Sequence, residues 1–305
     1  MTHAVGVPTA EPPVTANRWE LFRALGAIVD TPEAARVASP ALGLPAPSAA
    51  DHTSVFVLNL PPYASVYLGP DGALGGEGTD RVAGFWRVLG ISPPTEPDHL
   101  AALLGLYASL GEAVTTARKP AVISALSTAQ ATLFWEHLHS WLPGYLHAVG
   151  DLPASGLTSW AGLLQAVIDA ESRVQPPSPA LPLALREAPP GIDPQADPQD
   201  LAGLLTIPVR AGMILTRHCL ALGAGQASVG HRMGERRFTL RAMLEQDPPA
   251  TLDWLAGEAR RWARCHDSRR DGSETARWWA ARARRTAQVL HEQTASAAST
   301  GAMTP

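Results

Sequence analysis

Apolar residues recur at intervals of three and four along most of the chain, which is the spacing of one face of an α-helix. The clearest case is residues 100–110, LAALLGLYASL, where leucines and a tyrosine fall on one face. Residues 55–60 stay open between helix and extended segment, because two prolines follow them directly. The other predicted helices are 79–89, 127–149 (bent or broken at Pro143-Gly144), 158–174, 200–222, 235–246, 250–266 and 273–294.

The start of the 100–110 pattern carries an unusual group of polar residues, TEPDH. Pro97 is predicted in the first turn of the helix, with Thr95 or Glu96 as the cap. A carboxylate at Asp98 would be stabilised there by the helix dipole. A helix start therefore explains Pro97 and Asp98, whereas it leaves His99 unexplained.

Composition supports an all-α fold. Ala and Leu dominate while β-branched residues are comparatively scarce, and 46% hydrophobic against 17% charged residues is enough for a packed core. Eight prolines within residues 176–198 predict a linker or hinge loop. The predicted organisation is a helical core over 1–175, this linker, a helical region over 199–295 packing on or completing the core, and a disordered tail over 296–305.

The net charge of −4 hides an asymmetry along the chain. Residues 1–204 carry nine Lys and Arg against 19 Asp and Glu, whereas residues 205–305 carry 15 against nine. An acidic front suits a basic partner. The basic tail could meet a nucleic acid, another anionic surface or the front itself.

Signals of catalysis and of ligand chemistry are weak. His137 and His139 stand two apart, so they do not share a helix face, and no G-x-S-x-G elbow or P-loop occurs. The cysteines Cys219 and Cys265 cannot build a disulfide framework or a zinc site alone. We therefore expect no enzyme activity, metal site or cofactor. An enzyme with His99 as general base beside Asp98 is the least favoured alternative, because no second catalytic group is visible.

Neither a signal peptide nor a run of the roughly 20 apolar residues that span a bilayer is present in the sequence. This predicts a cytoplasmic protein without membrane insertion.

Two segments resemble the TorD/DmsD/NarJ family of redox-enzyme maturation chaperones. EPDHLAALLGLYASL is similar to the helix-opening motif Glu-x-Pro-Asp-His-Leu, and FWEHLHSWLP is similar to a downstream helix with an aromatic, a His-Leu and a Trp before a proline. The two follow in the family's order, about 30 residues apart. The preceding PYASVYLGPDGALGGE is similar to an actinobacterial-like branch, and the resemblance covers about residues 50–175.

The resemblance implies a single TorD-like helical-bundle domain with an additional C-terminal helical region. It implies a chaperone that binds the twin-arginine leader, or the mature N-terminus, of a molybdopterin oxidoreductase catalytic subunit until the cofactor is inserted, as a monomer or a homodimer. Carboxylates would pair with the two guanidinium groups, and an apolar groove would take the hydrophobic run. The candidate peptide-binding residues are Asp98, His99, Glu96, Tyr63, Tyr67, Trp135, His137 and Trp141.

A nucleic-acid-associated regulator remains the alternative from a different class. Tryptophans are interleaved with the arginines of residues 250–285, and residues 230–238, GHRMGERRF, are the densest basic cluster. Arginine is also common on the solvated faces of Ala-rich helices, so intramolecular pairing or solvation of this cluster is the favoured interpretation.

Overall fold

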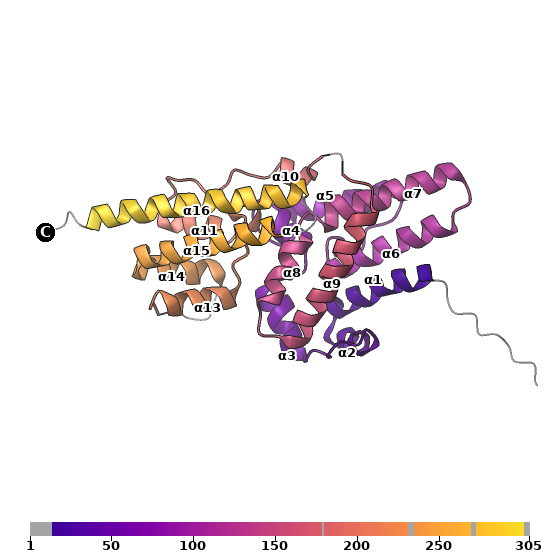
Figure 1. The fold of residues 1–305 in the computed structure, drawn as a ribbon, viewed down its shortest axis with the longest axis horizontal. Coiled ribbons are helices and arrows are strands. Elements are labelled where there is room, and N and C mark those ends of the chain that lie inside the picture. Colours follow the sequence, from indigo (N-terminus) through magenta and orange to yellow (C-terminus); the bar gives the residue numbers. More distant parts are fainter. Residues whose placement is uncertain (1–13, 179, 231–234, 270–272, 302–305) are drawn as a thin grey trace, which may run out of the picture.

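The computed structural model describes residues 14–178, 180–230, 235–269 and 273–301, and within them every regular element is a helix. The all-α prediction is confirmed. The molecule is elongated, with α1 to α9 in one half and α11 to α16 in the other (Figure 1). None of the helices in the described ranges combines the length and apolar content of a bilayer-crossing segment.

The N-terminal half is built around the apolar face predicted for residues 100–110. This helix, α6, packs along α1, and α8 packs along α9. The elements of this half are α1 (Val14–Asp30), α2 (Pro32–Ala41), α3 (Ala49–His52), the π-helix η1 (Thr53–Asn59), α4 (Ala64–Leu68), α5 (Gly76–Val88), α6 (Leu100–Thr116), α7 (Pro120–Thr132), the π-helix η2 (Leu133–Leu138), α8 (Leu142–Gly150) and α9 (Ser155–Val174).

Two segments of this half were predicted as broken or left open. The helix predicted to be bent or broken at Pro143-Gly144 is divided into α7, η2 and α8, and Pro143 lies in the first turn of α8, just after the break. A proline is well tolerated at that position, since a first-turn N–H has no partner within the helix. The open segment 55–60 is helical, because it lies almost entirely within η1.

The proline-rich segment 176–198 crosses between the halves and contains one short helix, α10 (Leu183–Arg186). It is anchored rather than free, since Leu185 and Ile192 are buried and the Pro189 carbonyl accepts a hydrogen bond from Arg282 at 2.9 Å.

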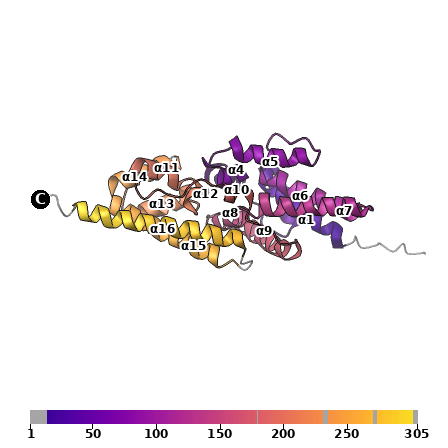
Figure 2. The ribbon, with the colours of Figure 1, turned by 90° about the horizontal axis from the view of Figure 1, so that it is seen from above.

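The C-terminal half is dominated by the long helices α15 (Pro248–Asp267) and α16 (Glu274–Gly301), which run side by side (Figure 2). Their contact is rich in buried alanines, including Ala256, Ala259 and Ala283, which let the backbones approach closely. The last helix continues to Gly301, into the segment predicted as disordered, and residues 302–305 lie outside the described residues. The elements are α11 (Pro198–Leu205), α12 (Pro208–Ala211), α13 (Arg217–Gln226), α14 (Arg236–Gln246), α15 (Pro248–Asp267) and α16 (Glu274–Gly301).

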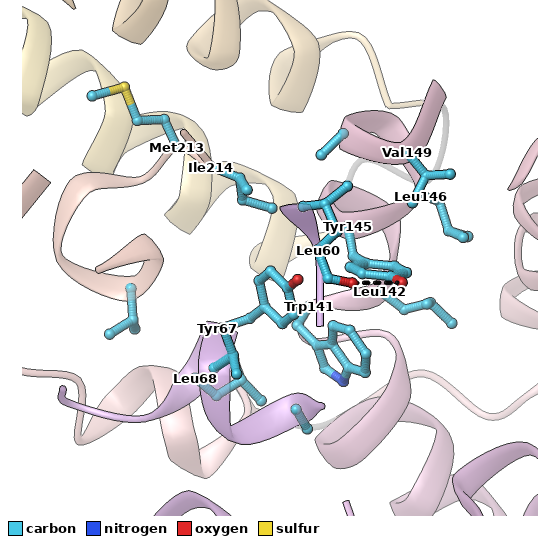
Figure 3. Packing of buried hydrophobic residues seen from close by; sticks show 14 of the residues in the cluster. Leu60, Tyr67, Leu68, Trp141, Leu142, Tyr145, Leu146, Val149, Met213 and Ile214 are labelled. Atoms are coloured by element: carbon cyan, nitrogen blue, oxygen red, sulfur yellow. Dashed lines mark hydrogen bonds between the residues drawn. The ribbon is translucent and has the colours of Figure 1, made fainter. Parts of the chain in front are cut away.

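The two halves share one hydrophobic core. Where they meet, Tyr67 stacks on Trp141, and the Tyr145 hydroxyl donates a hydrogen bond of 3.2 Å to the Leu60 carbonyl (Figure 3). Met213 and Ile214 from the C-terminal half belong to the same buried cluster. This continuity fixes the surfaces along the boundary, including those considered below.

Candidate peptide-binding site

The starts of α4 and α6 are held together by a single antiparallel bridge between Tyr63 and His99. The Leu100 N–H donates to the Pro62 carbonyl at 2.8 Å, and the Ala64 N–H donates to the Asp98 carbonyl at 3.1 Å. Two segments more than thirty residues apart in sequence therefore form one rigid corner.

Asp98 is the buried centre of this corner, with 2% of its surface exposed. Its Oδ2 accepts a hydrogen bond from the Ser65 N–H at 3.0 Å, and its Oδ1 accepts one from the Thr79 hydroxyl at 3.1 Å. The carboxylate thus caps α4 and ties it to α5. The prediction that Pro97 and Asp98 lie in the first turn of the following helix was wrong, because both precede α6.

His99 is the N-cap of α6. Its Nδ1 accepts a hydrogen bond from the Ala101 N–H at 3.3 Å, and its ring lies edge-to-face against Tyr63 with centroids 4.8 Å apart. Burial lowers the pKa of His99, despite the carboxylates nearby. A neutral ring suits the accepting role of Nδ1. The histidine that a helix start could not explain from sequence is therefore the cap itself.

Exposed carboxylates surround this buried centre. Glu96 is exposed beside Tyr63, and Asp30 at the end of α1 adds its negative charge at both Tyr63 and His99. Glu33, in the first turn of α2, acts with Asp30 on the neighbouring His52. Within the described ranges no ion pair involves Asp30, Glu33 or Glu96. We call Asp30, Glu33, Tyr63 and Glu96 the acidic corner.

Tyr63 is the half-buried aromatic residue of the acidic corner. Burial raises the pKa of Tyr63 to about 12, and the carboxylate of Glu96 adds to the shift. The hydroxyl therefore keeps its proton at neutral pH and can donate a hydrogen bond. Together, the residues of the acidic corner offer oxygen acceptors and an aromatic ring to a cationic ligand.

Three other candidate residues lie in the core. Tyr67 and Trp141 are stacked with ring centroids 5.1 Å apart (Figure 3). The Tyr67 hydroxyl donates to the Pro61 carbonyl, and the Trp141 indole donates to the His137 carbonyl. His137 is itself buried, and burial lowers its pKa to about 4. All three are enclosed by protein in this structure, so direct contact with a peptide stays an untested prediction.

Trp135 lies in a different environment from the acidic corner. Its indole N–H donates to the Pro176 carbonyl at 2.7 Å, and it lines an open pocket of 560 Å³ with residues of α9, the proline-rich segment and α16. The structure therefore brings together Tyr63, Glu96, Asp98 and His99, and it separates Trp135 from them.

Asp30 and Glu33 were missed by the sequence reasoning. They belong to the segment VDTPE that joins α1 to α2, more than sixty positions before Glu96. Their one local signal is the helix-start pattern Thr31-Pro32-Glu33, which predicts a cap and no ligand. No group of three His, Cys, Asp or Glu residues with a metal-binding arrangement occurs within the described part of the chain.

Comparison with known proteins finds a family match for part of the chain. A search of curated proteins gives no match. The family model described as nitrate reductase delta subunit matches residues 41–146, a stretch that includes α4, the Tyr63–His99 bridge, α6 and η2. The resemblance drawn from the two sequence motifs is thereby confirmed over residues 41–146, which are similar to the nitrate reductase delta-subunit family.

Proposed function

We propose that this protein is a cytoplasmic chaperone that binds the twin-arginine leader, or the N-terminal segment, of a molybdopterin-containing oxidoreductase subunit at the acidic corner. It would hold the subunit during folding and cofactor insertion, before export. The observation that carries the proposal is the set of exposed carboxylates of Asp30, Glu33 and Glu96, none of them ion-paired among the described residues, around a half-buried tyrosine.

Arginine is the cation that this chemistry favours. A planar guanidinium can bond two carboxylate oxygens at once and can also lie on an aromatic ring, whereas an ammonium acts as a point charge. The acidic corner supplies both kinds of partner. In this proposal Asp98 and His99 contact no peptide directly and act as positioning residues, because their polar atoms hold the starts of α4 and α6.

An apolar surface adjoins the acidic corner. The negative charges of Asp30 and Glu33 act on His52. The π-helix η1 begins at the next residue, Thr53. Val57 and Leu58 of η1 are 63% and 42% exposed, although they are large hydrophobic residues. We propose that the hydrophobic run of a leader lies across Val57 and Leu58 while its arginines occupy the corner.

Calorimetric titration tests this proposal. A synthetic twin-arginine leader peptide is titrated into the wild-type protein, the double variant Asp30→Asn/Glu96→Gln, and the control Glu245→Gln, which changes an exposed carboxylate on α14. We expect the double variant to bind about tenfold more weakly, since the two lost, partly exposed charge-assisted contacts are together worth about 1.4 kcal/mol. A Lys-Lys version of the peptide should also bind more weakly.

Absence of binding by the wild-type protein would remove the leader from the proposal. Equal binding by the double variant and the control would place the leader elsewhere on the surface.

A further inference from the structure

A second cavity lies at the boundary between the halves and is not used by the proposed corner. It has a volume of 300 Å³ and is lined by residues at the end of α8 and on α13 and α15. We call it the junction pocket, after its position, and define it by Asp151, Leu222, Trp254, Glu258 and Arg261. Its volume is at the lower end of the range for small-ligand pockets, about 300–1,000 Å³, so it has room for one ligand side chain.

One wall of the junction pocket already holds a guanidinium. Arg261 donates from Nη1 to Asp151 Oδ2 at 2.8 Å, and its Nη2 lies 2.9 Å from Glu258 Oε2. Each contact involves only one of the two oxygens of its carboxylate. Asp151 Oδ1 and Glu258 Oε1 accept no hydrogen bond from any described residue. The wall therefore has unused acceptors and one negative charge in excess.

The facing wall is apolar. Leu222 is 55% exposed, and Trp254 is half-buried beside it. Trp254 is fixed against α13 because the ring occupies the space of a side chain at Gly223, where an added Cβ would lie 2.3 Å from it. A cation with an apolar neighbour would therefore meet complementary surfaces on both sides.

The thiol in this pocket gives no sign of nucleophilic chemistry. Cys219 lies 3.7 Å from Glu258, and burial raises the pKa of its thiol to about 12. The group thus stays protonated at neutral pH, which favours a binding role for the pocket over a reactive one.

The junction pocket and the acidic corner are joined by η1. At its far end, the Asn59 Oδ1 accepts a hydrogen bond from the N–H of His218, a residue that lines the pocket. At its near end, His52 lies beside Asp30 and Glu33. The exposed Val57 and Leu58 lie between these two ends.

We propose that the junction pocket binds a further arginine of the client segment, beyond the pair at the acidic corner, with an adjacent apolar residue on Leu222 and Trp254, and that Arg261 competes with this arginine for the two carboxylates. This inference rests on the proposed function for the identity of the client, while the chemistry of the ligand follows from the guanidinium that the pocket already holds. Removing Arg261 would free both carboxylates for the incoming arginine.

The test uses the full chain and the peptide acetyl-Ala-Arg-Leu-Leu-amide, which carries one arginine followed by two apolar residues. Binding is followed by tryptophan fluorescence. We expect Arg261→Gln to bind the peptide about tenfold more tightly than wild type, and Glu258→Gln to bind it about tenfold more weakly. Arg260→Gln is the matched control, because Arg260 is the exposed neighbour and takes part in no ion pair among the described residues. Trp254→Phe should abolish most of the fluorescence change.

Equal affinities of Arg261→Gln and Arg260→Gln would overturn the competitor role, and wild-type affinity in both Glu258→Gln and Asp151→Asn would overturn the site. The double variant Asp30→Asn/Glu96→Gln should bind this short peptide as wild type does. Failure of the corner and failure of the pocket are therefore distinguishable.

Discussion

Asp98 illustrates how one side chain supports the acidic corner without facing solvent. Its carboxylate accepts hydrogen bonds from the Ser65 N–H at the start of α4 and from the Thr79 hydroxyl of α5. Both helices precede Asp98 in the chain. Its negative charge is buried at the place where the Tyr63–His99 bridge crosses. The position of Tyr63 and Glu96 therefore depends on Asp98.

Asp98→Ala should destabilise the fold by about 2 kcal/mol, because the buried Ser65 N–H and the Thr79 hydroxyl lose their acceptor. Asp51→Ala is the matched control. It removes the carboxylate of an exposed capping box on α3 and should cost only about 0.5–1 kcal/mol. Urea unfolding of the two variants measures the difference. Equal losses would show that Asp98 is no more than an ordinary helix cap.

The helix-capping role that the sequence predicts for Asp98 differs from the role that the structure shows. A carboxylate just before an apolar helix predicts a cap of that helix, since local spacing is all that a pattern contains. The helix that Asp98 caps lies thirty-three residues earlier, and only tertiary structure brings it there. His99 was singled out because no local role explained it, yet its role is local.

At the scale of the elements, the packing of α1 on α6 positions the acidic corner. Asp30 is the last residue of α1, and His99 is the N-cap of α6. The approach is close at Gly111, where an added Cβ would lie 2.3 Å from the Trp19 ring. Gly105, on the same helix, has open space at the corresponding position. The two glycines therefore serve different purposes.

Gly111→Ala should destabilise the protein by about 1–3 kcal/mol, because Trp19 must move out of a packed core. Gly105→Ala should instead stabilise it by about 0.5–1 kcal/mol, since alanine is the better helix former and meets nothing. Thermal unfolding of both variants measures the contrast. Destabilisation of similar size in the two would contradict the close packing of α1 on α6.

Long periodic segments are the part of the fold that the sequence predicts well. Residues 158–174 and 250–266 lie within α9 and α15, because their apolar faces repeat over many turns. A break of 127–149 near Pro143-Gly144 was predicted, but the π-helical segment η2 before it was not. The spacing of apolar residues does not distinguish a π-helix from an α-helix over a single turn.

At the scale of the whole molecule, the acidic front and the basic tail of the chain differ in how their charges are paired. In the acidic front, the carboxylates of the acidic corner form no ion pair with any residue that the structure describes. Several arginines of the basic tail are engaged within the protein, since Arg284 pairs with Asp267 at 2.6 Å and Arg282 lies over Trp278. The densest basic cluster, residues 230–238, includes positions 231–234, which lie outside the described residues.

The shared core also explains why the acidic corner and the junction pocket belong to one surface system. Tyr67, Trp141 and Tyr145 lock α4 to α8 (Figure 3). The end of α8 lies beside the junction pocket. A client segment that contacts both sites would therefore bind one continuous body.

Co-purification from the host is the most direct measurement of the central claim, the binding of an oxidoreductase precursor through the acidic corner. The tagged wild-type protein, Asp30→Asn/Glu96→Gln and Glu245→Gln are isolated in parallel, and bound proteins are quantified by mass spectrometry. We predict a molybdopterin oxidoreductase subunit that retains its leader, about tenfold depleted in the double variant and unchanged in the control. Recovery of no such subunit, or of equal amounts with all three proteins, would contradict the account.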